Sequence, residues 1–427
     1  MTASDVERLA RAGLSRLAEP GDETAWALVQ VLGAVGALEL IRSNRPAPRK
    51  LSFAVARQLA GLGEGPSSER PGAEGLLSDE LAYHPELAGF MPHLGRGLQR
   101  WRPRVPDLNP ERDLATVARF GGRLVIPGDD EWPERLRDLG PTEPLALWVR
   151  GAPSLSDAVR ESVALVGSRH ASAYGRALAA DWAYGLVDRG YCVVSGGAYG
   201  IDAQAHVGAL NVGESAGVPT VSFLAGGIDR FYPGGNTSLF DQILENGLIV
   251  AEAAPGCSPR KFRFLLRNRL IAASSRATVV IEAGWRSGAL NTAHQAAELM
   301  RPVGAVPGSV FAATSAGCHR LLREACAICV TDISELVELA GPLTVTAPAA
   351  PAMLPFEAAA ERRASDALLP ADARLLDALP VRQYVDVTAL QKSAGMSLTE
   401  VRSGLSRLEL AELAARAGTG WRRTTRR

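Results

Sequence analysis

The sequence predicts an α/β protein whose central part is an extended Rossmann-like, doubly wound parallel sheet. Within residues 163–341, short apolar runs rich in Val, Ile and Ala alternate with helical stretches, and most runs end in Gly or Ser. The runs are VALVGS, YCVVSGG, PTVSFLAGG, LIVAEA, ATVVIEAG and VGAVPGS. Strands buried on both faces are continuously apolar, and parallel neighbours need helical crossovers. The Gly-rich loops therefore gather at the carboxyl edge of the sheet, where such folds bind ligands.

Three further segments surround this sheet. Residues 1–105 are expected to form a helical, SAM-like domain, interrupted at 63–75 by the surface insertion GEGPSSERPGAEG. The Rossmann domain covers 110–341 and is entered through the β-rich runs GGRLVI and EPLALWVRG. Residues 342–370 are rich in Ala, Pro and Thr without periodicity, which indicates a linker. Residues 371–427 predict three helices and a β-wing, a small winged-helix domain whose third helix opens with a capping box from Ser397 to Glu400.

The composition is that of an ordinary soluble globular protein. Of 427 residues, 47% are hydrophobic and 22% charged, and 46 basic residues balance 46 acidic ones, which argues against a general coat for nucleic acid but not against a local patch. The expectation is that no apolar run approaches the ~20 residues of a membrane span and that the start lacks a signal peptide, so a cytoplasmic location is expected.

Cysteine usage gives no indication of a disulfide framework or of a cofactor. The five cysteines are scattered and odd in number, which fits buried thiols in a reducing compartment. Cys326 and Cys329 form a C-x-x-C, but no second ligand pair follows. We therefore expect neither a metal nor a cofactor.

The segment SPRKFRFLLRNRLI, residues 258–271, is the strongest local departure from neutrality, because six Lys or Arg and no Asp or Glu lie between Ala253 and Ile281. A helix from about Lys261 would direct one set of side chains to the core: Phe262, Leu265, Leu266, Leu270 and Ile271. Another face would carry Lys261, Phe264, Arg267 and Asn268. Cations beside an exposed ring suit single-stranded nucleic acid, because the cations follow phosphates and the ring stacks on bases. The alternative is a solvated basic helix whose Phe264 belongs to the core.

The loops after the first two predicted strands also carry groups suited to a ligand. Gly167-Ser168-Arg169 combines a tight turn, free N–H groups at a helix start and a guanidinium, a set that binds phosphate unless Arg169 pairs with a surface acid. In SGGAYGID, three glycines allow close backbone approach, and Asp202 is predicted to cap the next helix. Asp202 and His206 share a helix face, so they are either a catalytic pair or a cap and a structural histidine.

Glu282 follows the fifth strand and precedes the small-residue turn Ser287-Gly288. Its carboxylate is either a general acid or base, or an acceptor for backbone amides or a nearby arginine. No nucleophile lies at a readable position beside Asp202 and His206, so no catalytic residue is assigned.

Taken together, VGSR, SGGAYGIDAQAH, GGIDRFYPGGN, SPRKFRFLLRNRLIA, EAGWRSGALNTA and AVPGS…SAGCHRLL occur in this order and resemble the DprA (Smf) family over roughly residues 110–340. The resemblance implies an extended Rossmann fold that binds single-stranded DNA without acting as an enzyme. It also implies a homodimer formed through this domain, and help in loading the recombinase RecA during natural transformation or related recombination. By position, the resemblance assigns DNA binding to Gly167, Ser168, Arg169, Ser195, Gly197, Gly200, Lys261, Phe264, Arg267, Asn268 and Arg269.

The sequence departs from the family pattern at two places. Gly234 stands where some members carry a lysine that contacts DNA, and residues 1–100 lack a clear PGxGP-type helix-hairpin-helix turn, so that segment is not expected to bind DNA.

Two other functions stay open at this point. The first is a nucleotide hydrolase of the lysine-decarboxylase-like Rossmann class, although residues 286–292 lack the glycine pair and following glutamate of its PGGxGTxxE loop. The second is a regulator that reads duplex DNA through the C-terminal domain, which contains ten basic and six acidic residues. The third helix of that domain would offer Arg402, Ser403, Ser406 and Arg407 to a major groove.

Overall fold

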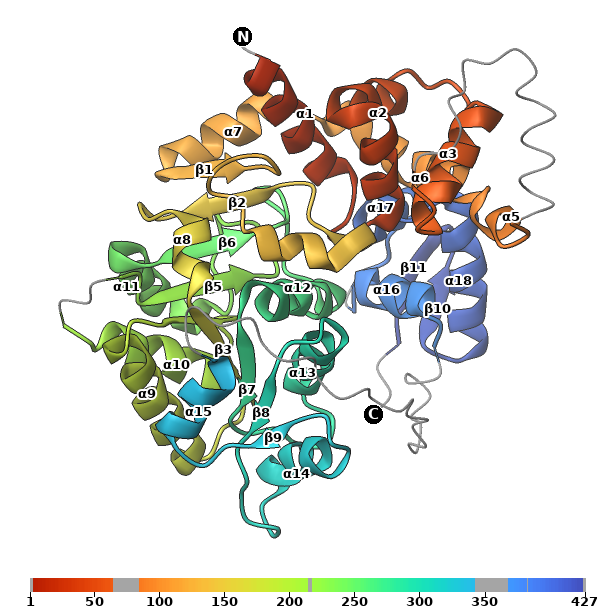
Figure 1. The fold of residues 1–427 in the computed structure, drawn as a ribbon. Coiled ribbons are helices and arrows are strands. Elements are labelled where there is room, and N and C mark those ends of the chain that lie inside the picture. The colour runs from red at the N-terminus through yellow and green to blue at the C-terminus, as the bar shows by residue number, and fades with distance from the viewer. Residues whose placement is uncertain (1–2, 64–83, 214–216, 342–367, 382, 425–427) are drawn as a thin grey trace. The chain divides into compact units, whose positions relative to one another are not determined.

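The computed structural model describes residues 3–63, 84–213, 217–341, 368–381 and 383–424 (Figure 1). The chain divides into two compact units, one formed by Met1–Glu111 with Pro355–Arg427 and the other by Arg112–Leu354. We call them the helical unit and the sheet unit. The predicted insertion, apart from Gly63, and the predicted linker up to residue 367 lie outside the described residues.

The sheet unit is built on a nine-stranded sheet with the order β1-β2-β6-β5-β4-β3-β7-β8-β9. All pairs from β6 to β9 are parallel, and β1 and β2 extend the sheet in antiparallel fashion. In the central register, Val163 of β3 lies opposite Val193 of β4 and Ala277 of β7. The predicted fold class is confirmed. The strands are β1 Gly122–Val125, β2 Leu147–Arg150, β3 Ser162–Val166, β4 Cys192–Ser195, β5 Thr220–Leu224, β6 Leu248–Ala251, β7 Ala277–Val280, β8 Val303–Ala305 and β9 Ile328–Cys329.

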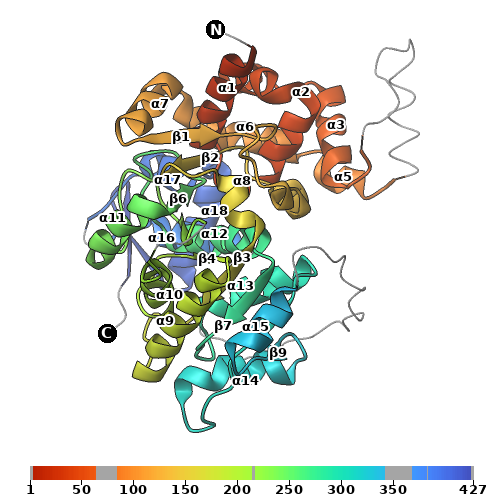
Figure 2. The ribbon, with the colours of Figure 1, turned by 60° about the vertical axis from the view of Figure 1, so that its left-hand side comes forward.

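Helices cover both faces of the sheet, as Figure 2 shows, and side chains of each strand alternate between two cores. In β3, Val163 and Leu165 join the core under α9, α10 and α15, whereas Ala164 and Val166 join the core under α8, α12, α13 and α14. Burial on both faces explains why the strands read as continuous apolar runs. The helices are α8 Leu155–Arg160, α9 Ala173–Asp188, α10 Ile201–Leu210, α11 Thr237–Asn246, α12 Lys261–Ser274, α13 Gly288–Glu298, α14 Ala316–Arg323 and α15 Ile333–Ala340.

The strand order contains one topological switch point. From β3 the chain adds β4, β5 and β6 on one side, and then crosses to place β7 and β8 on the other side. The loops that leave β3 and β7 therefore run apart at the carboxyl edge. Such a divergence leaves a crevice in which open α/β sheets bind ligands.

The helical unit contains helices from both ends of the chain. In the C-terminal part, three helices are followed by the antiparallel hairpin of β10 and β11, and the predicted capping box is present, with Ser397 Oγ accepting from Glu400 N and Glu400 accepting from Ser397 N. A winged-helix classification of this part stays a prediction. The elements are α1 Ala3–Leu17, α2 Glu23–Arg42, α3 Arg49–Leu59, α5 Leu87–Phe90, α6 His93–Trp101, α16 Pro370–Ala378, α17 Val387–Ala394, α18 Leu398–Leu410, β10 Ala414–Ala417 and β11 Gly420–Arg423, with α7 Pro110–Arg119 at the boundary of the two units.

Helix α2 corrects one expectation. It is long and apolar enough to cross a membrane by length and composition, so the statement that no apolar run approaches that length is wrong. Half of its most apolar window is buried inside the protein, and the helix is interrupted at Gly33, where φ is 70°. One such helix is weak support for a membrane span, because core helices of soluble proteins have the same composition.

Candidate nucleic-acid interface

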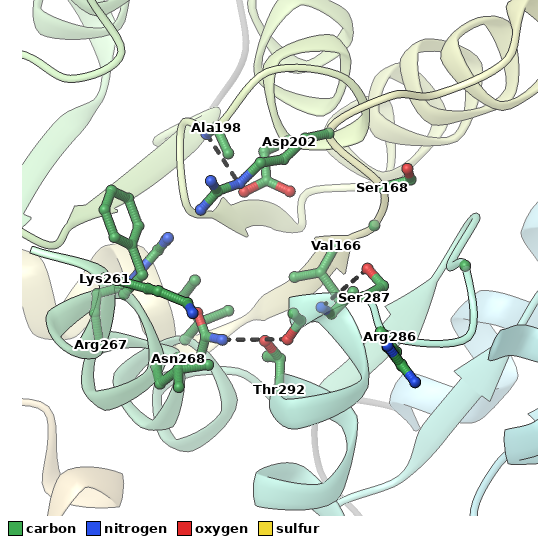
Figure 3. A pocket seen from close by; sticks show the side chains of 18 of the residues that line it. Val166, Ser168, Ala198, Asp202, Lys261, Arg267, Asn268, Arg286, Ser287 and Thr292 are labelled. Atoms are coloured by element: carbon green, nitrogen blue, oxygen red, sulfur yellow. Dashed lines mark hydrogen bonds between the residues drawn. The ribbon is translucent and has the colours of Figure 1, made fainter. Parts of the chain in front are cut away.

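A pocket of about 650 Å³ lies at the carboxyl edge, over the switch point between β3 and β7. In Figure 3, Lys261, Arg267 and Asn268 of α12 lie on one side of it, and Arg286 and Ser287, which precede α13, lie on the other. The pocket is lined by Val166, Gly167, Ser168, Arg169, His170, Ala198, Asp202, Tyr232, Pro259, Lys261, Phe264, Leu265, Arg267, Asn268, Ile271, Gly284, Arg286, Ser287, Gly288, Ala289 and Thr292.

The rim of the pocket carries a cation stacked on an aromatic ring. Arg169 is exposed, and its guanidinium carbon lies 4.9 Å from the centroid of the Phe264 ring. Phe264 in turn meets Tyr232 edge-on, with 5.6 Å between the ring centroids, and Tyr232 is 49% exposed. Lys261 is exposed one helical turn before Phe264. The structure thus brings together residues from three separate loops or helices, with positive charge and π-faces at one rim.

Helix α12 begins at Lys261, as predicted, but its faces differ from the prediction. Leu270 and Ile271 are buried as expected, whereas Leu265 is 49% exposed and lines the pocket. Arg267 and Asn268, placed by the prediction on a polar face, are buried. The reason is that the carboxyl-terminal half of α12 is enclosed on all sides, between the sheet and α13, so a single solvated face does not exist there.

Arg267 forms part of the pocket floor. Its side chain is packed against Gly196, where an added Cβ would collide with the guanidinium, and its Nη1 donates to the carbonyl oxygen of Phe223 (3.1 Å). Burial lowers the pKa of Arg267 to about 10, and the nearby Asp202 carboxylate opposes that shift. Burial raises the pKa of Asp202, and Arg267 counteracts this rise. The positive charge below the glycine turn is therefore fixed in place but partly offset by Asp202.

The other two members of the RNR triplet connect α12 to its neighbours. Asn268 Nδ2 donates to Gly288 O and Asn291 Oδ1, both at 3.3 Å, which ties α12 to α13. Arg269 is 4% exposed and makes a bidentate ion pair with Glu252, with both N···O distances at 2.8 Å. Arg269 does not line the pocket. Its buried guanidinium and its pairing with Glu252 favour a structural role, and the assignment of Arg269 as a DNA-binding residue stays a prediction.

The glycine turn after β4 shapes the wall below Arg169. Gly200 has φ 80° and lies against the carbonyl oxygen of Ser168, so only glycine fits there without strain. Gly197 also has positive φ. Ser195 is fully buried and donates to Leu165 O (2.7 Å), which connects β4 with β3 and leaves its hydroxyl unavailable to DNA. These contacts favour a structural role for Ser195, and its assignment to DNA binding stays a prediction; the glycines shape the turn.

Asp202 and His206 bond to different partners, which favours structural roles for both. The residue at the N-cap of α10 is Gly200, so the predicted capping role of Asp202 is wrong; Asp202 lies in the first turn, and its Oδ2 accepts from Ala198 N (3.4 Å). His206 is fully buried, with Nδ1 2.7 Å from Thr220 Oγ1 of β5, and burial lowers its pKa to about 3. A neutral, buried imidazole has a structural role.

Glu282 connects three loops of the carboxyl edge. Its carboxylate accepts from Ser172 N (2.8 Å), Ser172 Oγ (2.6 Å) and Thr314 Oγ1 (3.3 Å), and its residue is 4% exposed. Glu282 does not line the pocket, whereas Ser287 and Gly288 do. Ser287 also caps α13, because its Oγ accepts from Ala289 N (3.3 Å). These contacts fit the backbone-bonding interpretation of Glu282 rather than proton transfer to a ligand.

Sequence reasoning missed His170, Leu265 and Arg286 as lining residues of the pocket. Two of them carry a signal that was available: His170 follows the GSR loop, and Arg286 precedes Ser287, so both stand directly after predicted strands. Leu265 carried the opposite signal, because an apolar residue at helical spacing predicts a core position.

Comparison with known proteins places this geometry in a family. The family model described as DNA recombination-mediator protein A matches residues 123–341. The chain is 38% identical over 98% of its length to the putative DNA processing protein DprA of Mycobacterium tuberculosis, of which it covers 95%, and 40% identical over 41% of its length to DNA processing protein DprA of Streptococcus pneumoniae, of which it covers 61%. The X-ray structure of the Streptococcus pneumoniae protein superposes with a TM-score of 0.52 at 26% identity, over 79% of this chain and 97% of that one. The chain therefore belongs to the DprA (Smf) family of DNA recombination mediators.

Proposed function

We propose that this protein binds single-stranded DNA at the carboxyl edge of the sheet unit and acts as a non-enzymatic recombination mediator. The observation that carries the proposal is the exposed Arg169 guanidinium over the Phe264 ring, with Tyr232 beside the ring and Lys261 one helical turn away. Cations neutralise phosphates, and rings that reach solvent, as the exposed Tyr232 and the half-buried Phe264 do, stack on unpaired bases. A duplex hides its base faces, so this combination favours single strands.

The proposed binding is largely independent of sequence. The rim offers charge and π-faces, and every base has a π-face, so affinity depends on stacking and phosphate contacts rather than on base edges. Removing one stacked ring is expected to weaken binding by ~1–3 kcal/mol. Removing one phosphate contact lowers the slope of log K against log salt by about 0.7 for a single strand.

The test is fluorescence anisotropy with labelled single-stranded and duplex DNA across a salt series. Variants Arg169→Ala and Lys261→Ala are expected to weaken single-strand binding and lower its salt slope, and Phe264→Ala to weaken it with the slope unchanged. The matched control is Arg189→Ala, an exposed arginine directly after α9, at the opposite edge of the sheet. Equal single-strand affinity for wild type and the Lys261→Ala/Phe264→Ala double variant would overturn the site assignment.

Family membership supports a finer proposal. The bound strand is protected and passed to RecA, during natural transformation or related recombination, by a cytoplasmic homodimer that pairs through the sheet unit. RecA-dependent strand exchange on a DNA coated with single-strand-binding protein measures the first part, and light scattering of the full chain measures the second. If the protein binds single strands normally but does not stimulate RecA-dependent strand exchange, RecA loading is removed from the proposal.

Contacts in the structure weigh against both alternatives. The nucleotide hydrolase needs a free carboxylate at the pocket. Glu282 lies outside the lining and is held by Ser172 and Thr314, and Asp202, which does line the pocket, is buried beside Arg267 and accepts from Ala198 N. On the third helix, Arg402, Ser403, Ser406 and Arg407 are exposed as the duplex-reading alternative predicts. Arg407, however, donates to both oxygens of Asp372 at 2.7 Å, which lowers its availability to a phosphate. The chemistry that the pocket presents is that of a binding site.

A further inference from the structure

A second cation–aromatic pair lies at the carboxyl edge, on the far side of the pocket from Phe264. Trp285 lies in the loop that follows β7. Its neighbours Gly284 and Arg286 line the pocket, and Trp285 itself is 52% exposed. The Arg320 guanidinium of α14 lies 5.4 Å from its ring centroid and is also held by Glu324 at 2.8 Å. A large ring held by a fixed cation while half of it faces solvent presents a rigid stacking surface.

The loop after β8 continues this aromatic edge. Strand β8 pairs with β7, so the loop that leaves it follows next along the sheet. Gly317 N, in the first turn of α14 where this loop ends, donates to Ala283 O (2.6 Å) and so ties α14 to the loop of Trp285. At its tip Phe311 is 95% exposed and Val310 is 80% exposed. Exposed apolar side chains grouped beside a binding site indicate a ligand surface rather than a core.

The charge of this surface is compatible with DNA. From Ala283 to Arg320 the sequence holds one acidic residue, Glu298, which ends α13 away from the carboxyl edge. The two loops, residues 283–287 and 306–315, contain Arg286 and no Asp or Glu. The carboxylates beside them are engaged, because Glu282 accepts from Ser172 and Thr314 and Glu324 pairs with Arg320. A protein partner would gain equally from the exposed rings. Gly284 and Arg286, the two residues that flank Trp285, line the pocket, and this connection favours the same strand of DNA.

We infer that Trp285, supported by Arg320 and followed by Phe311, is a second base-stacking platform for single-stranded DNA. This inference rests on the proposed function and extends it. The strand would run across the sheet edge from Phe264 and Tyr232, over the switch-point pocket, to Trp285 and Phe311. Four strand spacings of ~4.8 Å separate β5 from β8, so the path is ~19 Å long and accommodates several nucleotides.

Tryptophan fluorescence of the full chain tests the platform directly. Trp285 is the one exposed tryptophan among the seven, since Trp26 is half-buried and the others are buried. Titration with oligothymidylates of ~4–16 nucleotides is expected to quench this emission, with the quench growing once the strand is long enough to reach Trp285. An emission that stays constant at saturating single-stranded DNA overturns the inference.

Substitutions separate stacking from other effects. Trp285→Ala is expected to weaken binding of the longer oligomers roughly tenfold, which corresponds to about 1.4 kcal/mol, and to leave the shortest ones unaffected. Trp285→Phe keeps a ring and should retain most of the affinity while losing the quench. The matched control is Tyr184→Ala, an aromatic residue 46% exposed on α9.

The outcomes distinguish the two proposals. If Phe264→Ala weakens binding but Trp285→Ala matches wild type at every length, the second platform is wrong and the proposed function stands. If wild type binds no single-stranded DNA, the proposed function fails and the platform fails with it. A Trp285→Ala variant that binds DNA normally but loses a protein interaction would assign the surface to a protein partner and overturn the inference.

Discussion

The buried ion pair between Arg269 and Glu252 provides a sharp test of the difference between structural and DNA-binding arginines in α12. The side chains are 4% and 10% exposed, two N···O contacts measure 2.8 Å, and Arg269 Nε also donates to Thr142 O (3.1 Å). Arg269→Ala leaves the Glu252 carboxylate buried without that guanidinium. Removing one partner of such a pair destabilises a protein by ~3–5 kcal/mol.

For a unit of this size, each kcal/mol lowers the Tm by about 2–4 °C, so Arg269→Ala should lower it by about 10 °C. Replacing both partners, as in Arg269→Met/Glu252→Leu, should recover most of the loss, because no buried charge is then left unmatched. Differential scanning calorimetry measures the stability, and anisotropy below the unfolding range measures single-strand binding. A stable Arg269→Ala variant that loses DNA affinity as Arg169→Ala does would refute this reasoning.

Two further predictions concern residues below the pocket. The pKa of His206 falls from its ordinary 6.5 to about 3 on folding, so on acidification the unfolded chain binds a proton before the folded chain does. The contribution of His206 to stability is therefore complete above pH 6.5 and is lost as the pH falls toward 3. The free energy of unfolding of wild type, relative to His206→Gln, should therefore fall by about 1.4 kcal/mol per pH unit in urea titrations below pH 6.5, and parallel pH profiles would contradict this. Gly200→Ala should destabilise the protein by ~1–3 kcal/mol and weaken single-strand binding, because φ is 80° and the added Cβ meets Ser168 O. Gly234→Ala, where nothing lies within 4 Å of the added atom, is the control, and equal effects of the two substitutions would show that the turn is not constrained.

The sheet and its loops could be predicted because the signals are local. Each buried strand is a continuous apolar run that ends in Gly or Ser, so the parallel sheet, its ligand-binding edge and the start of α12 at Lys261 follow from the sequence. Arg169 and Phe264 were correctly placed at one edge, since both follow strands of the same sheet.

The errors arise where burial depends on tertiary packing. Helical periodicity assigns one solvated face to α12, but the second half of this helix is enclosed, which buries Arg267 and Asn268. Arg269 pairs with Glu252, which directly follows β6 and so lies outside the sequence pattern of the helix. Asp202 was predicted as a cap because its residue type favours that position, yet Gly200, with its positive φ, begins the helix instead. The stacking of Arg320 on Trp285 joins residues 35 positions apart and has no local signal.

Photocrosslinking tests most directly whether single-stranded DNA stacks on the rings at the pocket rim. Single-stranded DNA carrying 5-iodouracil reacts with aromatic side chains that stack on the base, and mass spectrometry of the digested adduct identifies the residue. We expect adducts on Phe264 or Tyr232. Their yield should fall with Arg169→Ala and at high salt, and Arg189→Ala should leave it unchanged. Adducts confined to the exposed Tyr384 of the helical unit would contradict this expectation.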